Sequence, residues 1–358
     1  MRKYYTRPCN FYYGNFAKIL IKKKKALTLA GNPHIAFDKV EVFERSKKRT
    51  IKKYLYSISE IRKISGKKKH LINSDLKIIT SERKKILNLK FNTHQIMGIL
   101  NVTPDSFSDG GLYLKKNKSY NHGSLMINEG ASIIDIGGES TRPGSKIVNE
   151  KVEWERVKST IIKLKKKFPK TILSLDTRKS NIMKKGIDAG INLINDVSGL
   201  NFDKQSFNTI SLKKIPFILN HMQGTPRTMQ INPKYESVVL DIFDFFENKI
   251  NFCLKNNFKK ELIIIDPGIG FGKNLKHNLK ILSNISIFHS LGCPILIGTS
   301  KKRFIEHIVT KFDTPNRIGG TLSSVLYGLS QGVQLFRVHN VKEINQGILV
   351  FKKILNTN

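Results

Sequence analysis

The sequence predicts an α/β protein whose main part is a (β/α)8 barrel of the TIM type, preceded by a small basic α+β extension. Three observations predict this fold. From Gln95 onward, short apolar runs recur eight times, each followed by a longer segment that suits a helix. The eight units occupy about 265 residues, close to the ~250 residues usual for such barrels. Nearly every run also ends in polar side chains.

The candidate strands are apolar nearly throughout and rich in β-branched residues. Strands of a parallel sheet that are buried on both faces have this composition. We expect them at residues 96–100, 132–136, 171–175, 191–194, 216–219, 262–265, 294–297 and 334–336.

Between the strands, residues 150–167 and 235–255 have the length and amphipathic periodicity of helices, and Pro169 ends the first region. A doubly wound open sheet is the alternative arrangement. The strand ends favour the barrel, because a closed barrel brings every carboxyl end to one mouth. The polar residues at those ends are Asn101, Asp135, Asp176, Asn195, Asp196, Asn220, His221, Asp266, Ser300, Arg337 and His339.

Residues 1–93 do not continue this pattern, so we divide the chain into this extension and a barrel of residues 94–358. Residues 86–91 are expected to form an extra strand that closes the bottom of the barrel. The other expected elements are short strands at 27–29, 40–43 and 51–56 and a helix within 57–64.

The 358 residues include 63 Lys and Arg against 27 Asp and Glu, a formal net charge of +36, and 39% are hydrophobic. A chain this apolar can bury a core, so the charge does not imply disorder. Residues 1–93 hold 25 basic and 6 acidic residues, a net charge of +19. Nucleic-acid binding through the extension is one interpretation. Solvated lysine-rich faces are the simpler one, because the lysines recur along the whole chain without a nucleic-acid-binding motif.

Three cysteines, Cys9, Cys253 and Cys293, lie far apart and lack Cys-x-x-Cys or nearby His spacing. This pattern argues against disulfides and a structural zinc site. The basic N-terminus lacks an apolar run of signal-peptide length, and no uncharged run is long enough to span a membrane. We expect a cytoplasmic protein with no membrane partner.

Two loops after the first and second strands have compositions that suit ligand binding. The first, residues 101–111, combines Asn101, Phe107 and Asp109 with Gly and Pro, which is more than a simple connection requires. The second offers backbone amides, a hydroxyl and a guanidinium, a combination that suits an anion. A surface ion pair of its arginine is the alternative. The candidates in this second loop are Thr141, Arg142 and Pro143.

Asp176, Asn195 and Asp266 end three strands and would bring two carboxylates and an amide to one depth. Two buried carboxylates are costly without cations. Lys302, just after the seventh strand, is the nearest counter-charge. A fused heterocycle with N–H donors would form hydrogen bonds with these three residues. The alternative is a buried hydrogen-bond network that only stabilises the barrel, and it is most plausible for Asn195.

Arg337 and His339 alternate along the last strand, so both side chains face the mouth, where a diphosphate would bind them. Ser300 follows the seventh strand and either caps the next helix or binds a carboxylate at its N-terminus. Residues 268–273 are glycine-rich but match neither a Walker A sequence nor GxGxxG.

Eight segments, in this order, resemble those of dihydropteroate synthases. The likeness covers about residues 94–358 and is specific, because eight motifs in register do not recur by chance. The segments are IMGILNVTPDSFSDGG at 96–111, DIGGESTRPGS at 135–145, LSLDTRKS at 173–180, INDVSGL at 194–200, NHMQGTP at 220–226, DPGIGFGK at 266–273, GTSKKRF at 298–304 and RVHNV at 337–341.

The resemblance implies a transferase of folate biosynthesis. It would join 6-hydroxymethyl-7,8-dihydropterin diphosphate to 4-aminobenzoate, releasing diphosphate and forming 7,8-dihydropteroate. The resemblance also implies the same barrel, Mg²⁺ as cofactor and, as is common in this family, a homodimer through the last barrel helices.

The resemblance assigns roles to individual residues. The pterin would be held by Asp176, Asn195, Asp266 and Lys302, with Met222 and Phe271 packed near it. The diphosphate site would comprise Asn101, Thr141, Arg337 and His339, with Mg²⁺ bridging Asn101 and the diphosphate oxygens. The aminobenzoate side would comprise Phe107, Asp109, Arg142, Pro143 and Ser300. The catalytic set would be Asp109, Arg142, Asp176, Asp266, Lys302, Arg337 and His339.

Two departures from the family pattern are modest: Thr299 stands where Met is frequent, and Lys301 where Arg is usual.

A pterin-binding methyltransferase domain is the related alternative, since such domains share the barrel and the pterin-facing Asp and Asn. The loop segments argue against it, because a methyl carrier needs neither a diphosphate site nor a second-substrate site. A nucleic-acid binder that uses the extension is the alternative from another class.

Overall fold

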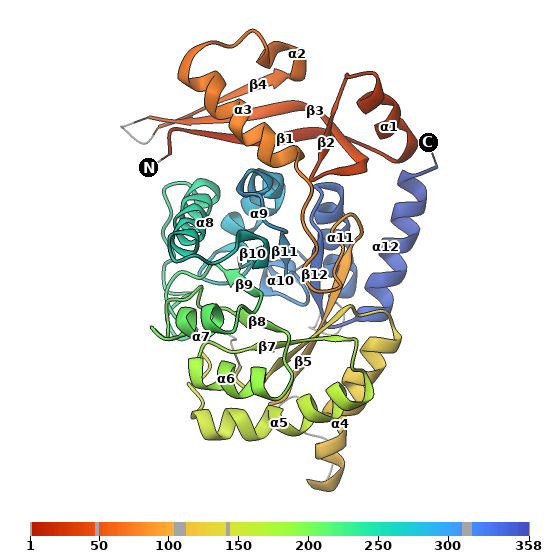
Figure 1. Ribbon diagram of the computed structural model, residues 1–358, viewed down its shortest axis with the longest axis vertical. Helices are drawn as coiled ribbons and strands as arrows, with labels where there is room; N and C mark the ends of the chain where they lie inside the picture. The colour runs from red at the N-terminus through yellow and green to blue at the C-terminus, as the bar shows by residue number, and fades with distance from the viewer. Residues whose placement is uncertain (1, 47–49, 104–111, 141–143, 310–316, 358) are drawn as a thin grey trace.

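All eight predicted strands are present, and their ends lie within two residues of the predicted bounds. The computed structural model describes residues 2–46, 50–103, 112–140, 144–309 and 317–357 (Figure 1). The strands are β5 (Gln95–Asn101), β6 (Ile133–Gly137), β7 (Ile172–Asp176), β8 (Leu193–Asp196), β9 (Phe217–Asn220), β10 (Ile263–Asp266), β11 (Leu296–Ile297) and β12 (Leu335–Val338).

The eight strands form one parallel sheet that closes into a barrel. Hydrogen-bonded neighbours follow the order β10-β9-β8-β7-β6-β5-β12-β11. A parallel bridge between Ile265 and Ile295 then joins β10 to the chain that enters β11. Because neighbours run in sequence order and the two ends of the sheet meet, the doubly wound alternative is excluded. All carboxyl ends of the strands therefore lie at one mouth.

The helices surround this sheet. The helix predicted over residues 150–167 is confirmed at both ends, and the second begins at Val238, three residues later than predicted. None of the helices in the described ranges is long and apolar enough to cross a membrane. They are α4 (Leu112–Asn128), α5 (Glu150–Lys167), α6 (Ser180–Asp188), α7 (Ser206–Leu212), α8 (Val238–Lys255), α9 (Leu275–Ser283), α10 (Arg303–Val309), α11 (Ile318–Ser330) and α12 (Val341–Leu355), with short 3-10 helices η2 (Lys260–Leu262) and η3 (Ile285–Leu291).

The bottom of the barrel is closed by a turn, so the extra strand predicted over residues 86–91 is wrong. Ile86 and Leu89 pair only with each other, across a turn in which Leu87 has a φ of +55°. This tight geometry turns the chain back instead of laying it beside a barrel strand. Ile86, Leu89 and Phe91 are buried against the inward-facing residues of the barrel, among them Met97, Ile133, Ile172, Leu193, Ile218, Ile264, Leu296 and Leu335.

The extension is a four-stranded antiparallel sheet with three helices. The strands β2 (Leu27–Leu29), β3 (Asn32–Arg45) and β4 (Ile51–Ser57) include the three predicted ones. The predicted helix is the single turn α2 (Ile58–Ile61), capped by Ser57 and Glu60. The strand β1 (Tyr4–Tyr13) and the helices α1 (Gly14–Lys22) and α3 (Gly66–Thr80) were not predicted.

This sheet packs against one end of the barrel, beside α8, η3 and the end of α12 (Figure 1). Tyr5 and Phe43 are buried in the same apolar core as the barrel helices. Polar contacts fasten the two parts: the Arg83 guanidinium donates to the His289 carbonyl at 2.8 Å, and the Ser286 hydroxyl donates to the Pro8 carbonyl at 2.9 Å. The extension and the barrel thus share buried surface.

Ile86, Leu89 and Phe91 form a plug at the bottom of the barrel, and this plug can be tested. Leu89→Ala should lower the free energy of unfolding by about 2–4 kcal/mol, because the cavity it leaves is enclosed by barrel strands. Leu87→Ala in the same turn is the control, since Leu87 is 45% exposed and should lose less than about 0.5 kcal/mol. Urea denaturation followed by circular dichroism measures both free energies of unfolding. Equal losses in the two variants would contradict the burial of Leu89 in the barrel.

Candidate active site at the mouth of the barrel

Arg337 is the centre of the polar cluster at the mouth. Its Nε donates to Asp135 Oδ2 at 2.6 Å, and its Nη2 donates to Asp176 Oδ2 at 2.8 Å. Asn195 Nδ2 donates to the same Asp135 oxygen at 2.9 Å. The guanidinium therefore links β12 to β6 and β7, and β8 joins the cluster through Asp135. The predicted residues Asp176, Asn195 and Arg337 do lie together.

Asp135 is a site residue that sequence analysis noted at a strand end but did not assign. Its carboxylate is fully buried, and its Oδ1 has no hydrogen-bond partner within the described residues. The available signal was an aspartate in an otherwise apolar strand, Ile133–Gly137. A buried carboxylate needs a cation or several donors, and Arg337 supplies the cation here.

Burial sets the electrostatics of this cluster. It raises the pKa of the Asp176 carboxyl, while the positive charge of Arg337 opposes this increase and the negative charge of Asp135 adds to it. The same guanidinium thus has to balance the charges of two buried carboxylates. A ligand with N–H donors would relieve that imbalance.

Asp266 and Lys302 lie nearby, and their opposite charges interact. Asp266 Oδ1 accepts the backbone N–H of Gly268 at 2.8 Å. The Lys302 ammonium donates to the Ile269 carbonyl and lies 4.4 Å from the centre of the Phe271 ring. Burial lowers the pKa of Lys302 to about 8, and the charge of Asp266 opposes this decrease. The pair offers an acceptor, a donor and an aromatic face together.

The glycine-rich loop, residues 268–273, is held in shape by close backbone neighbours. Gly268 has a φ of +67°, and a Cβ there would lie 2.0 Å from the His221 carbonyl oxygen, so only glycine fits. The buried ammonium of Lys273 lies 3.0 Å from His221 Nδ1 and donates to the Phe271 carbonyl at 2.7 Å. Burial lowers the pKa of both Lys273 and His221. Sequence analysis left this supporting pair unassigned.

His339 and Ser300 also meet at the mouth, from β12 and the end of β11. The Ser300 hydroxyl lies 3.0 Å from His339 Nδ1 and accepts the His339 backbone N–H at 3.2 Å. The next helix, α10, begins only at Arg303, so Ser300 does not cap it. Ser300 instead orients the imidazole.

Asn101 ends β5 beside the carboxylate of β7. A Cβ on Gly137 would lie 3.7 Å from Asp176 Oδ2 and 3.8 Å from Asn101 Oδ1, so the glycine leaves open the space between those two oxygens. Met222 and Phe271 are both half-buried and follow β9 and β10. The other predicted residues, Phe107, Asp109, Thr141, Arg142 and Pro143, lie outside the described residues.

Fold and site together define a barrel protein whose mouth gathers buried carboxylates, an amide and cations. The family model described as "Pterin binding enzyme" matches residues 97–339. The dihydropteroate synthases of Haemophilus influenzae and Escherichia coli K12 are 39% and 37% identical; each match covers 75% of this chain and 96% or 94% of the relative.

Solved structures agree with the sequence relatives. The dihydropteroate synthase of Yersinia pestis, in a sulfonamide drug complex, superposes with a TM-score of 0.70 at 37% identity, covering 74% of this chain and 96% of that one. The Xanthomonas albilineans enzyme in complex with 7,8-dihydropteroate gives 0.68 at 30% identity, covering 75% and 97%. The chain belongs to the pterin-binding enzymes and, within them, to the dihydropteroate synthases, transferases of folate biosynthesis.

The lowered pKa of Lys302 generates a pH prediction. Only the protonated amine carries the charge, so affinity for a pterin ligand should fall as the pH rises through about 8, approaching about tenfold per pH unit above it. Fluorescence titration of pterin binding from pH 7 to 9.5 measures this. Lys302→Met is the control, and it should bind weakly and lose this fall in affinity. The same pH profile in the unchanged protein and in Lys302→Met would rule out this role for Lys302.

Proposed function

We propose that residues 94–358 carry the whole reaction and that residues 1–93 contribute no reacting group. The reaction joins 6-hydroxymethyl-7,8-dihydropterin diphosphate to 4-aminobenzoate and yields 7,8-dihydropteroate and diphosphate. The observation that carries the proposal is the Arg337 guanidinium held between Asp135 and Asp176, beside the Asp266–Lys302 pair, at the mouth of the barrel.

The pterin would lie over the buried polar set. Asp176 and Asp266 would accept hydrogen bonds from the N–H groups of the ring, and Asn195 offers an amide beside them. Lys302 would donate to the ring carbonyl. Phe271, whose ring already lies against Lys302, and Met222 would pack on the flat face of the heterocycle.

The diphosphate would lie between β5 and β12. Arg337 uses Nε and Nη2 on the two carboxylates and retains further N–H donors for phosphate oxygens. His339, oriented by Ser300, would donate a second hydrogen bond. Asn101 and Thr141 complete this subsite. As the C–O bond to the pterin methylene breaks, these donors stabilise the charge that develops on the leaving diphosphate.

Mg²⁺ fits this arrangement. In the part of the chain that the structure describes, no group of three or more His, Cys, Asp or Glu side chains could hold a metal ion. The oxygen of Asn101 faces the open space beside Gly137. Mg²⁺ commonly takes one or two protein oxygens and completes its shell with water and phosphates, so Asn101 suits an ion that arrives with the diphosphate. When bound, the ion would neutralise charge on the leaving group.

The amine of 4-aminobenzoate would then attack the methylene carbon. The C–O bond breaks, a C–N bond forms, the diphosphate leaves with the bonding electrons, and the amine loses one proton. Asp176 and Asp266 stabilise the positive charge that the pterin carries at this stage, so no covalent enzyme intermediate is required. Phe107, Asp109, Arg142, Pro143 and Ser300 would bind the aminobenzoate and exclude water from the cation-like carbon.

Other features support the setting of this reaction. The three cysteines are free, and Cys253 and Cys293 are buried, which suits the reducing cytoplasm. An apolar cleft of about 550 Å³ between α11 and α12, lined by Leu322, Leu326 and Val350, suits a homodimer through these helices. The proposal assigns no role to a membrane or to nucleic acids.

An assay with both substrates and Mg²⁺ tests the function. Diphosphate release should require 4-aminobenzoate, which a pterin-dependent methyltransferase would not use. Arg337→Met should lower kcat about 100- to 1000-fold, since it removes the cation beside the leaving group. Lys213→Met, which removes an exposed cation that pairs with Asp188, is the matched control and should keep full activity. Diphosphate release without the amine would contradict the proposal.

The loop residues generate a separate prediction. Arg142→Ala should lower kcat about tenfold or more while the Kd of the pterin diphosphate changes less than about twofold, because Arg142 would act on the aminobenzoate and on the exclusion of water and not on the pterin. Asp109→Ala should behave in the same way. Stopped-flow turnover and calorimetry measure the two quantities, and equal losses in turnover and pterin affinity would count against the loop role.

A further inference from the structure

The segment of residues 223–237, here called the strap, connects β9 to α8 and lies against the glycine-rich loop. Gln230 Nε2 donates to the Gly270 carbonyl at 2.7 Å, and the Tyr235 hydroxyl donates to the Gly272 carbonyl at 2.8 Å. A Cβ on Gly272 would lie 2.5 Å from the Gln223 carbonyl oxygen. The loop that carries Phe271 therefore takes its shape partly from the strap.

The strap forms hydrogen bonds between its own two ends and a further one with the loop after β6. Gln223 Nε2 donates to the Lys234 carbonyl at 2.9 Å, and its Oε1 accepts the Lys234 backbone N–H at 3.0 Å. These two bonds close the strap into a ring. The Gly144 N–H donates to the Pro226 carbonyl at 3.0 Å. Movement of the strap would thus be transmitted to the mouth of the barrel.

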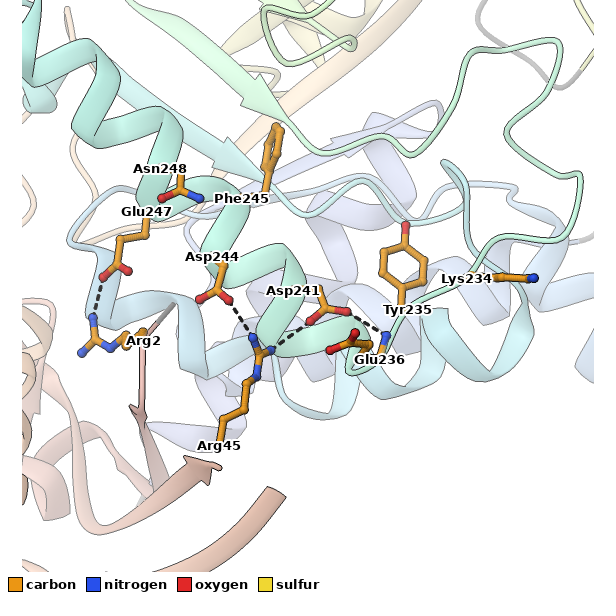
Figure 2. Close-up of a pocket in the computed structure, with 10 residues that line it drawn as sticks. All are labelled: Arg2, Arg45, Lys234, Tyr235, Glu236, Asp241, Asp244, Phe245, Glu247 and Asn248. Atoms are coloured by element: carbon orange, nitrogen blue, oxygen red, sulfur yellow. Dashed lines mark hydrogen bonds and ion pairs between the residues drawn. The ribbon is translucent and has the colours of Figure 1, made fainter. Parts of the chain in front are cut away.

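One carboxylate joins the strap to the extension. Asp241, in the first turn of α8, accepts the backbone N–H groups of Glu236 and Ser237 through Oδ2, at 2.9 and 3.0 Å. Its other oxygen, Oδ1, accepts from Arg45 Nη2 at 2.9 Å. Figure 2 shows Arg45 reaching from the end of β3 to α8, with Asp241 between it and the strap.

Arg45 is held rigidly at this junction, with only 3% of its side chain exposed. Its Nη1 donates to Asp244 Oδ2 at 2.7 Å, and its guanidinium lies 5.3 Å from the centre of the Tyr5 ring. The Tyr5 hydroxyl donates to the other Asp244 oxygen at 2.7 Å. A planar guanidinium that is already paired with Asp244 and packed on an aromatic ring loses little further freedom on holding Asp241.

We propose that Arg45 is a positioning residue for pterin binding, acting through Asp241, the strap and the glycine-rich loop. The inference rests on the proposed function and assigns the extension a part in it. Arg45 contacts no reacting group. It fixes the last residues of the strap, and Tyr235 then fixes the Gly272 carbonyl. Without the ion pair the strap can fluctuate, and Phe271 and Lys302 lose part of the order that binds the heterocycle.

Two variants test the ion pair and one controls for it. Arg45→Met removes the cation. Asp241→Asn also breaks the ion pair but keeps a carbonyl oxygen for the two backbone N–H groups of the strap. Glu247→Gln is the control, because it breaks the neighbouring ion pair from α8 to Arg2 (2.7 Å), in which neither residue belongs to the strap. Arg45→Lys keeps the positive charge and should retain part of the affinity for the pterin diphosphate that Arg45→Met loses.

The experiment compares the affinity for the pterin diphosphate with kcat and with the Michaelis constant for the aminobenzoate. Arg45→Met and Asp241→Asn should each raise the Kd of the pterin diphosphate about 5- to 20-fold, whereas kcat at saturation and the Michaelis constant for the aminobenzoate should change less than about twofold. The double variant should be no worse than the poorer single one, because both remove the same interaction. The control should leave all three constants unchanged. An unchanged pterin Kd, or equal losses in every constant, would overturn the proposal.

Hydrogen exchange on the full chain without substrates separates this proposal from the assigned reaction. In Arg45→Met, the amides of residues 223–237 and 268–273 should exchange at least about tenfold faster, while those of β6 and β7 stay unchanged. Faster exchange across the whole barrel would show a general loss of stability and overturn the proposal. If the unchanged protein failed to bind the pterin diphosphate, the proposed function would be wrong, and the exchange pattern would still decide whether Arg45 orders the strap and the glycine-rich loop.

Discussion

The site depends on keeping the Arg337 guanidinium buried between two carboxylates. Removing such charges from water is costly, and the cost is met only when each charge has a partner at hydrogen-bond distance. The curvature of the barrel provides that geometry, because it brings Asp135 and Asp176, on the neighbouring strands β6 and β7, within hydrogen-bond distance of Arg337 on β12. The plug at the other end seals the interior against water. The mouth is thus the end at which these charges can meet a ligand.

Much of this barrel could be predicted from the sequence, for a physical reason. A strand buried on both faces must be apolar along its length, and its polar residues can then lie only where it reaches the mouth. Asp176, Asn195, Asp266 and Arg337 follow from that rule. The role of Asp135 does not, because the sequence does not reveal which cation a buried carboxylate meets. Its partner lies 202 residues away, on the last strand of the chain, β12.

The extension shows the limit of the same reasoning. Its strands β2 and β4 have local alternation, but β1 mixes aromatic and polar residues without alternation and is defined by its pairing with β3 and by packing on the barrel. The helix α3 is rich in lysine and only weakly amphipathic, and buried residues such as Ile72 and Ile79 hold it in place. Tertiary contacts therefore settle what local propensity leaves open. The ion pair between Arg45 and Asp241 spans 196 residues and has no local signal.

The extension and the mouth are connected because the glycine-rich loop cannot hold its own shape. Gly268, Gly270 and Gly272 all have positive φ angles, and each residue of this kind is free in the unfolded chain and costly to order. Order has to come from neighbours: Lys273 and His221 from inside the barrel, and the strap from outside. A strap ordered only by its own ring of bonds could still move as a unit. Fixing its end to a buried arginine of a separate sheet removes that freedom, so residues far from the chemistry can affect how well the heterocycle is bound.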